Sequence, residues 1–150
     1  MNIDSAFKLF DIRGLYPQVV DEKLAFIVGK ALTKFQKPKS IVIASDTRES
    51  SGPIKNFLIN GLSQDCKKIS DLFEVPTPEF YFALATGEFD LGVMVTASHI
   101  SSDENGLKMV KKGGLPFDES EVTALKDLVK KMPSAQIIVP DFEPVRVNLT

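Results

Sequence analysis

Short apolar runs alternate along this chain with longer segments of helical periodicity, and this alternation constrains the fold more than any other feature. Three runs, SIVIAS (40–45), KISDLFEV (68–75) and DLGVMVTA (90–97), are rich in apolar and β-branched residues and predict buried strands. Amphipathic segments separate them. A chain that alternates in this way is expected to form a mostly parallel sheet with helices on both faces.

Capping residues and prolines mark the ends of the expected helices. Such residues satisfy or remove the backbone N–H groups that a first helical turn leaves unpaired. The expected starts are, in order, Asp21, Pro53, Thr77–Pro78 and Asp118, where Asp118 to Glu121 has the form of a capping box; the first helix should end before Pro38 and the second near Cys66.

The segment GLKMVKK (106–112) alternates like an edge strand. The DENG turn before it favours a hairpin-like return, so this strand is expected to run antiparallel at one edge. FKLFDIRGLY (7–16) predicts a short extended segment that leads into a loop. The predicted fold is therefore an α/β three-layer αβα sandwich, with a mostly parallel mixed sheet of about four strands and one antiparallel edge strand.

Composition favours one soluble domain in a reducing compartment. The 150 residues carry a net charge of −2 and are 43% hydrophobic. The single cysteine, Cys66, has no internal disulfide partner and is expected to be a small core residue. No signal peptide is evident, and no stretch approaches the ~20 apolar residues of a membrane span. We expect a cytoplasmic protein with no nucleic-acid or membrane partner.

The stretch VTASHISSDENG (95–106) contains the only histidine of the chain. Here an apolar strand runs directly into threonine, serine and histidine, and then into a polar turn. Loops at the ends of buried strands are where α/β proteins usually place binding and catalytic groups. This stretch is therefore the first candidate for a functional site.

Four motifs together resemble one family. FKLFDIRG, SDTRESSGP, VTASH and DENGLKMV, in this order and spacing, are similar to the first domain of the α-D-phosphohexomutases, in particular the phosphomannomutase/phosphoglucomutase branch. The resemblance covers residues 5–150, with about 133–150 as a linker toward further domains. It implies an enzyme that interconverts hexose 1-phosphates and hexose 6-phosphates through a phosphoserine and a hexose 1,6-bisphosphate, assisted by Mg²⁺.

The resemblance also implies roles for individual residues. It implies that Ser98 is the phosphorylated serine, whose phosphate is also a metal ligand, and that His99 lines the site beside it. It implies that Lys108 is the general acid/base and that Arg13 binds substrate. Asp46 and Arg48 are implied to support the serine loop structurally. Phosphoryl transfer depends mainly on positioning and charge neutralisation, which suits a serine surrounded by cations. The ten-residue spacing of Ser98 and Lys108 across a turn predicts that their side chains meet.

This chain departs from the family pattern in three places. Ile100 and Ser101 replace the usual Asn-Pro after the histidine, and the loss of proline predicts a less rigid loop. Phe10 replaces a tyrosine. The metal-binding, sugar-recognition and C-terminal phosphate-binding loops of the later domains are absent. The chain alone is therefore expected to be inactive. The alternative is a stand-alone, non-catalytic sugar-phosphate-binding or interaction module derived from this domain.

Overall fold

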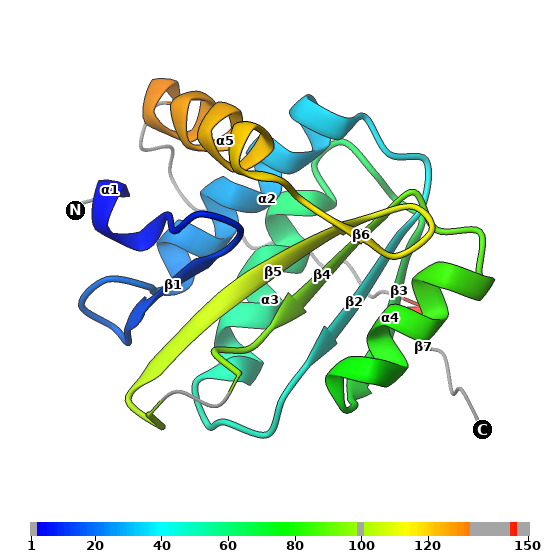
Figure 1. The fold of residues 1–150 in the computed structure, drawn as a ribbon, viewed down its shortest axis with the longest axis horizontal. Helices are drawn as coiled ribbons and strands as arrows, with labels where there is room; N and C mark the ends of the chain where they lie inside the picture. The colour runs from blue at the N-terminus through cyan, green and yellow to red at the C-terminus, as the bar shows by residue number, and fades with distance from the viewer. Residues whose placement is uncertain (1–2, 99–100, 133–144, 147–150) are drawn as a thin grey trace.

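The computed structural model describes residues 3–98, 101–132 and 145–146, which form a seven-stranded mixed sheet with helices on both faces (Figure 1). The strands are β1 (Ile12–Leu15), β2 (Ile41–Ser45), β3 (Ile69–Glu74), β4 (Leu91–Val95), β5 (Glu104–Lys111), β6 (Leu115–Pro116) and β7 (Val145–Arg146). Their order across the sheet is β1-β5-β4-β2-β3-β7, and β6 pairs with β5. Strands β2, β3, β4 and β7 are parallel, whereas β5 is antiparallel to β4, β1 and β6.

The helices form two layers, as the predicted αβα sandwich requires. They are α1 (Ile3–Ala6), α2 (Glu22–Gln36), α3 (Ser51–Leu62), α4 (Thr77–Thr86) and α5 (Glu119–Lys131). Helices α2, α3 and α5 pack on one face of the sheet and α4 covers the other. The N-caps expected from the sequence are present at Asp21, which accepts from the Leu24 N–H, and at Asp118, which forms a capping box with Glu121.

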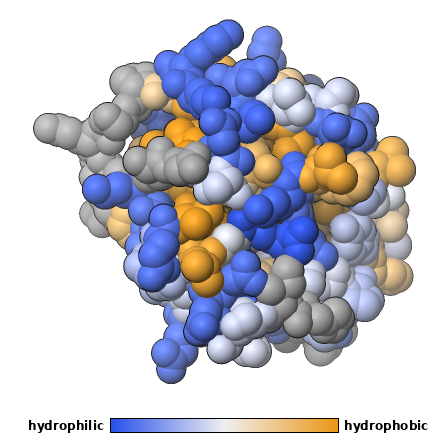
Figure 2. Space-filling model, turned by 60° about the vertical axis from the view of Figure 1, so that its left-hand side comes forward, coloured by the Kyte–Doolittle hydropathy of each residue, from blue (hydrophilic) through white to orange (hydrophobic). Residues whose placement is uncertain are grey.

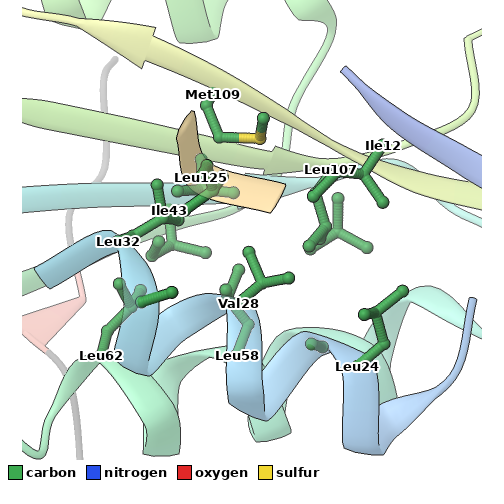
Figure 3. Close-up of a cluster of buried hydrophobic side chains, with 14 of the residues drawn as sticks. Ile12, Leu24, Val28, Leu32, Ile43, Leu58, Leu62, Leu107, Met109 and Leu125 are labelled. Atoms are coloured by element: carbon green, nitrogen blue, oxygen red, sulfur yellow. The ribbon is translucent and has the colours of Figure 1, made fainter. Parts of the chain in front are cut away.

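The larger part of the core lies between the sheet and the helices α2, α3 and α5. Leucine and valine side chains from α2 and α3 meet the inward side chains of β1, β2 and β5, as Figure 3 shows. Each fully buried side chain of this size stabilises the fold by about 1.5–3 kcal/mol. Gly29 and Gly61 bring α2 and α3 into close approach, because a Cβ at Gly61 would lie 2.1 Å from the Phe26 carbonyl oxygen. The core therefore fixes the strand ends on which the polar residues described below are placed.

Three details differ from the sequence expectation. The sheet has more strands than the four expected, and β5 is not an edge strand, because β1 and β6 pair along its outer side. Such coverage removes an exposed row of backbone donors and acceptors. Helix α3 begins at Ser51 and ends at Leu62 rather than running from Pro53 to Cys66, since proline is tolerated anywhere in the first turn.

The short elements α1 and β6 were not predicted. In the expected linker over about 133–150, only Val145–Arg146 is described, and these residues form β7 beside β3. The rest of that stretch lies outside the described residues. Cys66 is buried, as expected for a core residue.

Candidate active site

Polar residues gather where the parallel strands β2 and β4 end. These strands are neighbours with the same direction, so their carboxyl ends lie at one edge of the sheet. Asp46 follows β2 directly, and its N–H donates to the carbonyl of Val95, the last residue of β4 (3.0 Å). Thr96 and Ser98 follow β4. This is the edge at which open α/β sheets usually bind ligands.

The carboxylate of Asp46 is the centre of a hydrogen-bond network at this edge. Its Oδ1 accepts from the Ser51 hydroxyl (2.6 Å) and from the Arg48 backbone N–H (3.1 Å). Its Oδ2 accepts from Thr96 Oγ1 (2.8 Å) and pairs with Arg48 Nη1. Burial alone would raise the pKa of Asp46, but the hydrogen bonds from Ser51, Thr96 and the Arg48 backbone outweigh it and lower the pKa below its ordinary value. The carboxylate is thus held ionised, with its acceptor positions occupied.

Ser98 is held by this network in a left-handed backbone conformation, with φ of 61°. Its N–H donates to Thr96 Oγ1 (3.0 Å), and its carbonyl oxygen accepts from Arg48 Nη2 (3.0 Å). A residue other than glycine in this region of φ typically carries about 1–3 kcal/mol of strain. Because Thr96 and Arg48 both bind Asp46, one carboxylate fixes both partners of the Ser98 backbone. Asp46 and Arg48 therefore contact the serine segment as the resemblance implied.

Asn105, at the start of β5, extends the network and had no role in the sequence analysis beyond the turn. Its side chain is fully buried. Nδ2 donates to the hydroxyls of Ser50 (2.7 Å) and Ser51 (3.0 Å), and Oδ1 accepts from the Gly106 N–H (2.8 Å). Asn105 thereby connects β5 to Ser51 and, through it, to Asp46. The sequence signal for it was the polar run after β2, whose many hydroxyl groups need buried partners.

The turn after the serine survives without the family's proline. The Glu104 N–H donates to the carbonyl of Ser101 (3.0 Å), and the Asp103 N–H donates to its hydroxyl (3.3 Å). The Tyr16 N–H donates to the Asp103 carbonyl (2.9 Å), which ties this turn to the end of β1. Within the serine segment, residues 99–100 lie outside the described residues. The predicted position of His99 is therefore not described.

Arg13 and Lys108 project from one face of the sheet. Arg13 lies opposite Gly106 across the β1–β5 pair, and Lys108 follows two residues later on β5. Residues two apart in a strand share a face. Lys108 also lies opposite Met94, whose side chain belongs to the core beneath α4. A Cβ at Gly106 would lie 2.8 Å from Arg13 Cγ, so glycine lets the Arg13 side chain cross β5.

Lys108 lies opposite Met94, one residue before β4 ends at Val95, and Ser98 lies three residues beyond that end. In the described part of the chain the two side chains form no hydrogen bond with each other, and their predicted meeting stays a prediction. Arg13 lies nearer to the serine segment, since its neighbour Gly106 accepts from the Thr96 N–H (2.9 Å).

Two adjoining cavities lie beside these cations and share Phe10 and Asp11. The first, of about 590 Å³, is lined by Phe7, Lys8, Leu9, Phe10, Asp11, Arg13, Glu119, Thr123 and Lys126. The second, of about 460 Å³, is lined by Phe10, Asp11, Tyr81, Lys108, Met109, Pro116, Phe117 and Asp118. Phe10 is 57% exposed. On the side of the molecule in Figure 2, hydrophobic patches reach the surface between mostly hydrophilic residues.

The described residues do not by themselves fit the metal ion that the resemblance implied. No three of their histidine, cysteine, aspartate and glutamate side chains are grouped so that they could hold a metal. The carboxylate closest to the serine in the network, Asp46, has its oxygens engaged in hydrogen bonds. Within the same residues, no helix has the length and apolar character to cross a membrane.

Comparison with known proteins identifies relatives over almost the whole chain. Residues 4–136 match the family model described as phosphoglucomutase/phosphomannomutase, alpha/beta/alpha domain I. A phosphomannomutase of Escherichia coli is 38% identical over 141 residues, which are 94% of this chain and 30% of that protein. A phosphomannomutase of Klebsiella pneumoniae is 33% identical over 142 residues, covering 95% of this chain and 88% of that protein.

The solved structures agree with these matches. A phosphoglucomutase/phosphomannomutase family protein from Burkholderia thailandensis is 27% identical and aligns with a TM-score of 0.81. The alignment covers 99% of this chain and 34% of that one. The chain thus spans about a third of the length of this structure and 30% of the Escherichia coli relative. The matched region contains Arg13, Asp46, Ser98 and Lys108.

Proposed function

Because this chain belongs to the phosphoglucomutase/phosphomannomutase family and matches its domain I, we propose that it is the phosphoserine-bearing, N-terminal domain of a hexose phosphate mutase. The enzyme would interconvert hexose 1-phosphate and hexose 6-phosphate and would belong to the isomerases. The observation that carries this proposal is the fixed backbone of Ser98, at the carboxyl end of β4 and beside a sheet face that presents Arg13.

The proposed reaction begins with phosphorylated Ser98. A hydroxyl oxygen of the sugar attacks the phosphorus, a new O–P bond forms, and the bond to Ser98 Oγ breaks. Lys108, as general acid/base, takes the hydroxyl proton, and the freed Ser98 oxygen takes a proton from solvent. The hexose 1,6-bisphosphate then turns around, and Ser98 Oγ loses its proton to solvent and attacks the other phosphorus. The bond from that phosphorus to the sugar oxygen breaks, and Lys108 gives its proton to this oxygen.

Arg13 would bind the phosphate group that does not react. A guanidinium binds phosphate oxygens through two parallel N–H groups, and this fixes orientation as well as charge. Its place opposite Gly106, near the serine segment, supports this role. The role of His99 as a lining residue stays a prediction, because it lies outside the described residues.

Mg²⁺ remains part of the proposal as a cofactor, with the phosphate on Ser98 as the ligand from this chain. When bound, it would neutralise charge on the transferring phosphoryl group. Its carboxylate ligands would come from other domains of the full-length enzyme, since the described residues group no metal-binding set. Hexose 1,6-bisphosphate would serve as activator, and the chain alone would be inactive.

The test compares three samples. They are the native gene product, this 150-residue chain alone, and this chain mixed with the remaining domains of the native gene product. Mutase turnover is measured with hexose 1-phosphate, hexose 1,6-bisphosphate and Mg²⁺. The proposal predicts turnover by a native product several times heavier than this chain and none by the chain alone. Turnover by the chain alone, or none by a longer native product, would contradict it.

A second candidate is a solitary module that binds sugar phosphates without turning them over. Its support is the replacement of Asn-Pro by Ile100 and Ser101 in the segment that follows the serine. This reading predicts a native product no larger than the chain itself. It also predicts sugar-phosphate binding that survives the Ser98→Ala substitution.

A further inference from the structure

The guanidinium of Arg13 is held from one side only. Its Nε donates to Asp11 Oδ1 at 3.1 Å, with the Asp11 side chain 17% and the Arg13 side chain 34% exposed. Neither terminal nitrogen of Arg13 has a hydrogen bond or ion pair with the described part of the chain. An aspartate that paired with Arg13 for charge alone would be expected to take the bidentate geometry through the terminal nitrogens.

We propose that Asp11 is a positioning residue for phosphate binding: it holds Arg13 through Nε and so leaves both terminal N–H₂ groups to bind a phosphoryl group. Arginine is suited to this division of work, since its five donors form a rigid planar fork. One acceptor on Nε fixes the plane and direction of the fork. The inference rests on the proposed function, because it names the group that orients the phosphate-binding arginine of that same site.

The presence of a carboxylate, Asp11, beside a phosphate-binding arginine requires a physical explanation. A phosphate bound by Arg13 is repelled by the nearby negative charge of Asp11, which weakens affinity. Asp11 also lines both cavities, so it stands between the space beside Arg13 and the space beside Lys108. An apolar residue would avoid the repulsion but would leave the long Arg13 side chain without its local acceptor. The charge of the Asp11 carboxylate weakens phosphate affinity, but its hydrogen bond orients the Arg13 guanidinium.

Charge and orientation can be separated by two substitutions. Asp11→Asn removes the charge and keeps an oxygen that accepts from Nε, whereas Asp11→Leu has a similar shape and no acceptor. Inorganic phosphate is titrated into this chain, and the side-chain NMR signals of Arg13 are followed. Phosphate should shift the terminal nitrogen signals while the Nε–H signal stays hydrogen-bonded. Asp11→Leu should bind phosphate about five- to tenfold more weakly than Asp11→Asn, the equivalent of one hydrogen bond.

Asp65→Asn and Asp65→Leu form the matched control. Asp65 is an exposed carboxylate that pairs with Lys34 and lines neither of the two cavities, so its two variants should bind phosphate equally. Thermal unfolding of every variant confirms the fold; if Asp11→Leu unfolds, Asp11→Ala takes its place. Equal phosphate affinity of the asparagine and leucine variants at position 11 would overturn the proposal, as would a wild-type chain whose Arg13 signals ignore phosphate.

Kinetics of the full-length enzyme separate this inference from the proposed function. If the enzyme is a mutase, Asp11→Leu should raise KM relative to Asp11→Asn by a similar factor with little change in kcat, since it affects binding of the non-reacting phosphate. Active enzyme with equal KM values for both variants would overturn the Asp11 role alone. Inactive enzyme with unequal phosphate affinities would count against the mutase and leave the Asp11 role supported.

Discussion

Two strands of this sheet carry a residue in the left-handed region of φ near their carboxyl ends, and each is fixed by an aspartate. In β3, Phe73 has φ of 67°, and its N–H donates to Asp71 Oδ1 (2.8 Å). Asp71 also pairs with Lys55 (3.0 Å), which lies 5.4 Å from the centre of the Phe73 ring. After β4, Ser98 has φ of 61° and is fixed through Asp46.

These two networks, the Asp71 lock around Phe73 and the Asp46 lock around Ser98, differ in the elements that they connect. The Asp71 lock joins β3 to α3 through one ion pair whose side chains are 11% and 7% exposed, and it ends on an aromatic ring. The Asp46 lock joins the ends of β2 and β4, the start of α3 and, through Asn105, β5. It ends on a hydroxyl-bearing residue. Strained backbone alone therefore does not mark a functional site; the chemistry of the residue that it positions does.

The largest expected difference between the two locks is in catalysis. In the full-length enzyme, Ser98→Ala should lower mutase turnover by about 10⁴-fold or more, because the nucleophile is lost. Phe73→Ala should keep turnover of the same order as wild type. Both are measured with hexose 1-phosphate at saturating activator. Substantial turnover by Ser98→Ala would remove Ser98 from the reaction.

Loss of the aspartate should lower the unfolding free energy at both locks, but it should lower mutase activity only at the Asp46 lock. Asp46→Ala and Asp71→Ala each remove the carboxylate that pairs with a largely buried cation, Arg48 or Lys55, which should cost about 2–4 kcal/mol of unfolding free energy. Urea denaturation of this chain measures it. In the full-length enzyme, at a temperature where both variants are folded, only Asp46→Ala should lower kcat. Equal kcat for the two variants would show that the Asp46 network does not position Ser98.

Asn105→Ala should destabilise the chain by about 1–3 kcal/mol, because the Ser50 and Ser51 hydroxyls lose a buried partner. Asn56→Ala is the matched control, since Asn56 is exposed on α3, and it should change stability by less than about 0.5 kcal/mol. Urea unfolding compares the two. If both variants unfold at the same urea concentration as wild type, Asn105 is not part of the support of the serine segment.

The pH dependence of stability should reveal the Asp46 carboxylate. Its pKa is lower in the folded state than the ordinary value of 3.8, so the unfolded state binds the proton first. The stabilisation is complete above the ordinary value and is lost as pH falls through the folded-state value. Unfolding free energy measured from pH 7 down to acid should therefore fall less steeply in Asp46→Asn than in wild type. Parallel curves would contradict this assignment.

The smallest expected effect concerns the loop after the serine. Restoring Asn-Pro at Ile100 and Ser101 should reduce the freedom of the unfolded chain and stabilise it by about 0.4–1 kcal/mol. Proline at 101 keeps the carbonyl that accepts from the Glu104 N–H, and it removes the backbone N–H of residue 101 and the hydroxyl that accepts from the Asp103 N–H. The double variant should also raise turnover of the full-length enzyme. An unchanged rate would show that the present loop already holds Ser98 well enough.

Local patterns were sufficient to predict most of the fold. Buried strands such as β2 and β4 are continuous apolar runs, and the caps at Asp21 and Asp118 are short-range signals. The outer pairing of β5 with β1 and β6 could not be predicted in this way. It joins Ile12 to Leu107, nearly a hundred residues apart, and depends on the assembled sheet.

The candidate site likewise contains residues that local motifs identified and residues that only the assembled sheet brings together. Ser98, Arg13 and Lys108 were identified from motifs, whereas the place of Lys108 opposite Met94 depends on the register of β5 against β4, which the spacing along the chain does not give. Thr96 and Asn105 were missed as supporting residues. Their hydrogen bonds cross between strands, and a polar residue in a strand or turn carries no local sign of its distant partner.

The most direct test of the central claim is phosphopeptide mapping of the full-length enzyme after incubation with hexose 1,6-bisphosphate radiolabelled in its phosphates. The account predicts label on the peptide that contains Ser98, and release of that label into sugar phosphate when unlabelled hexose 1-phosphate is added. Label on another residue, or label on Ser98 that the sugar phosphate does not remove, would contradict the account.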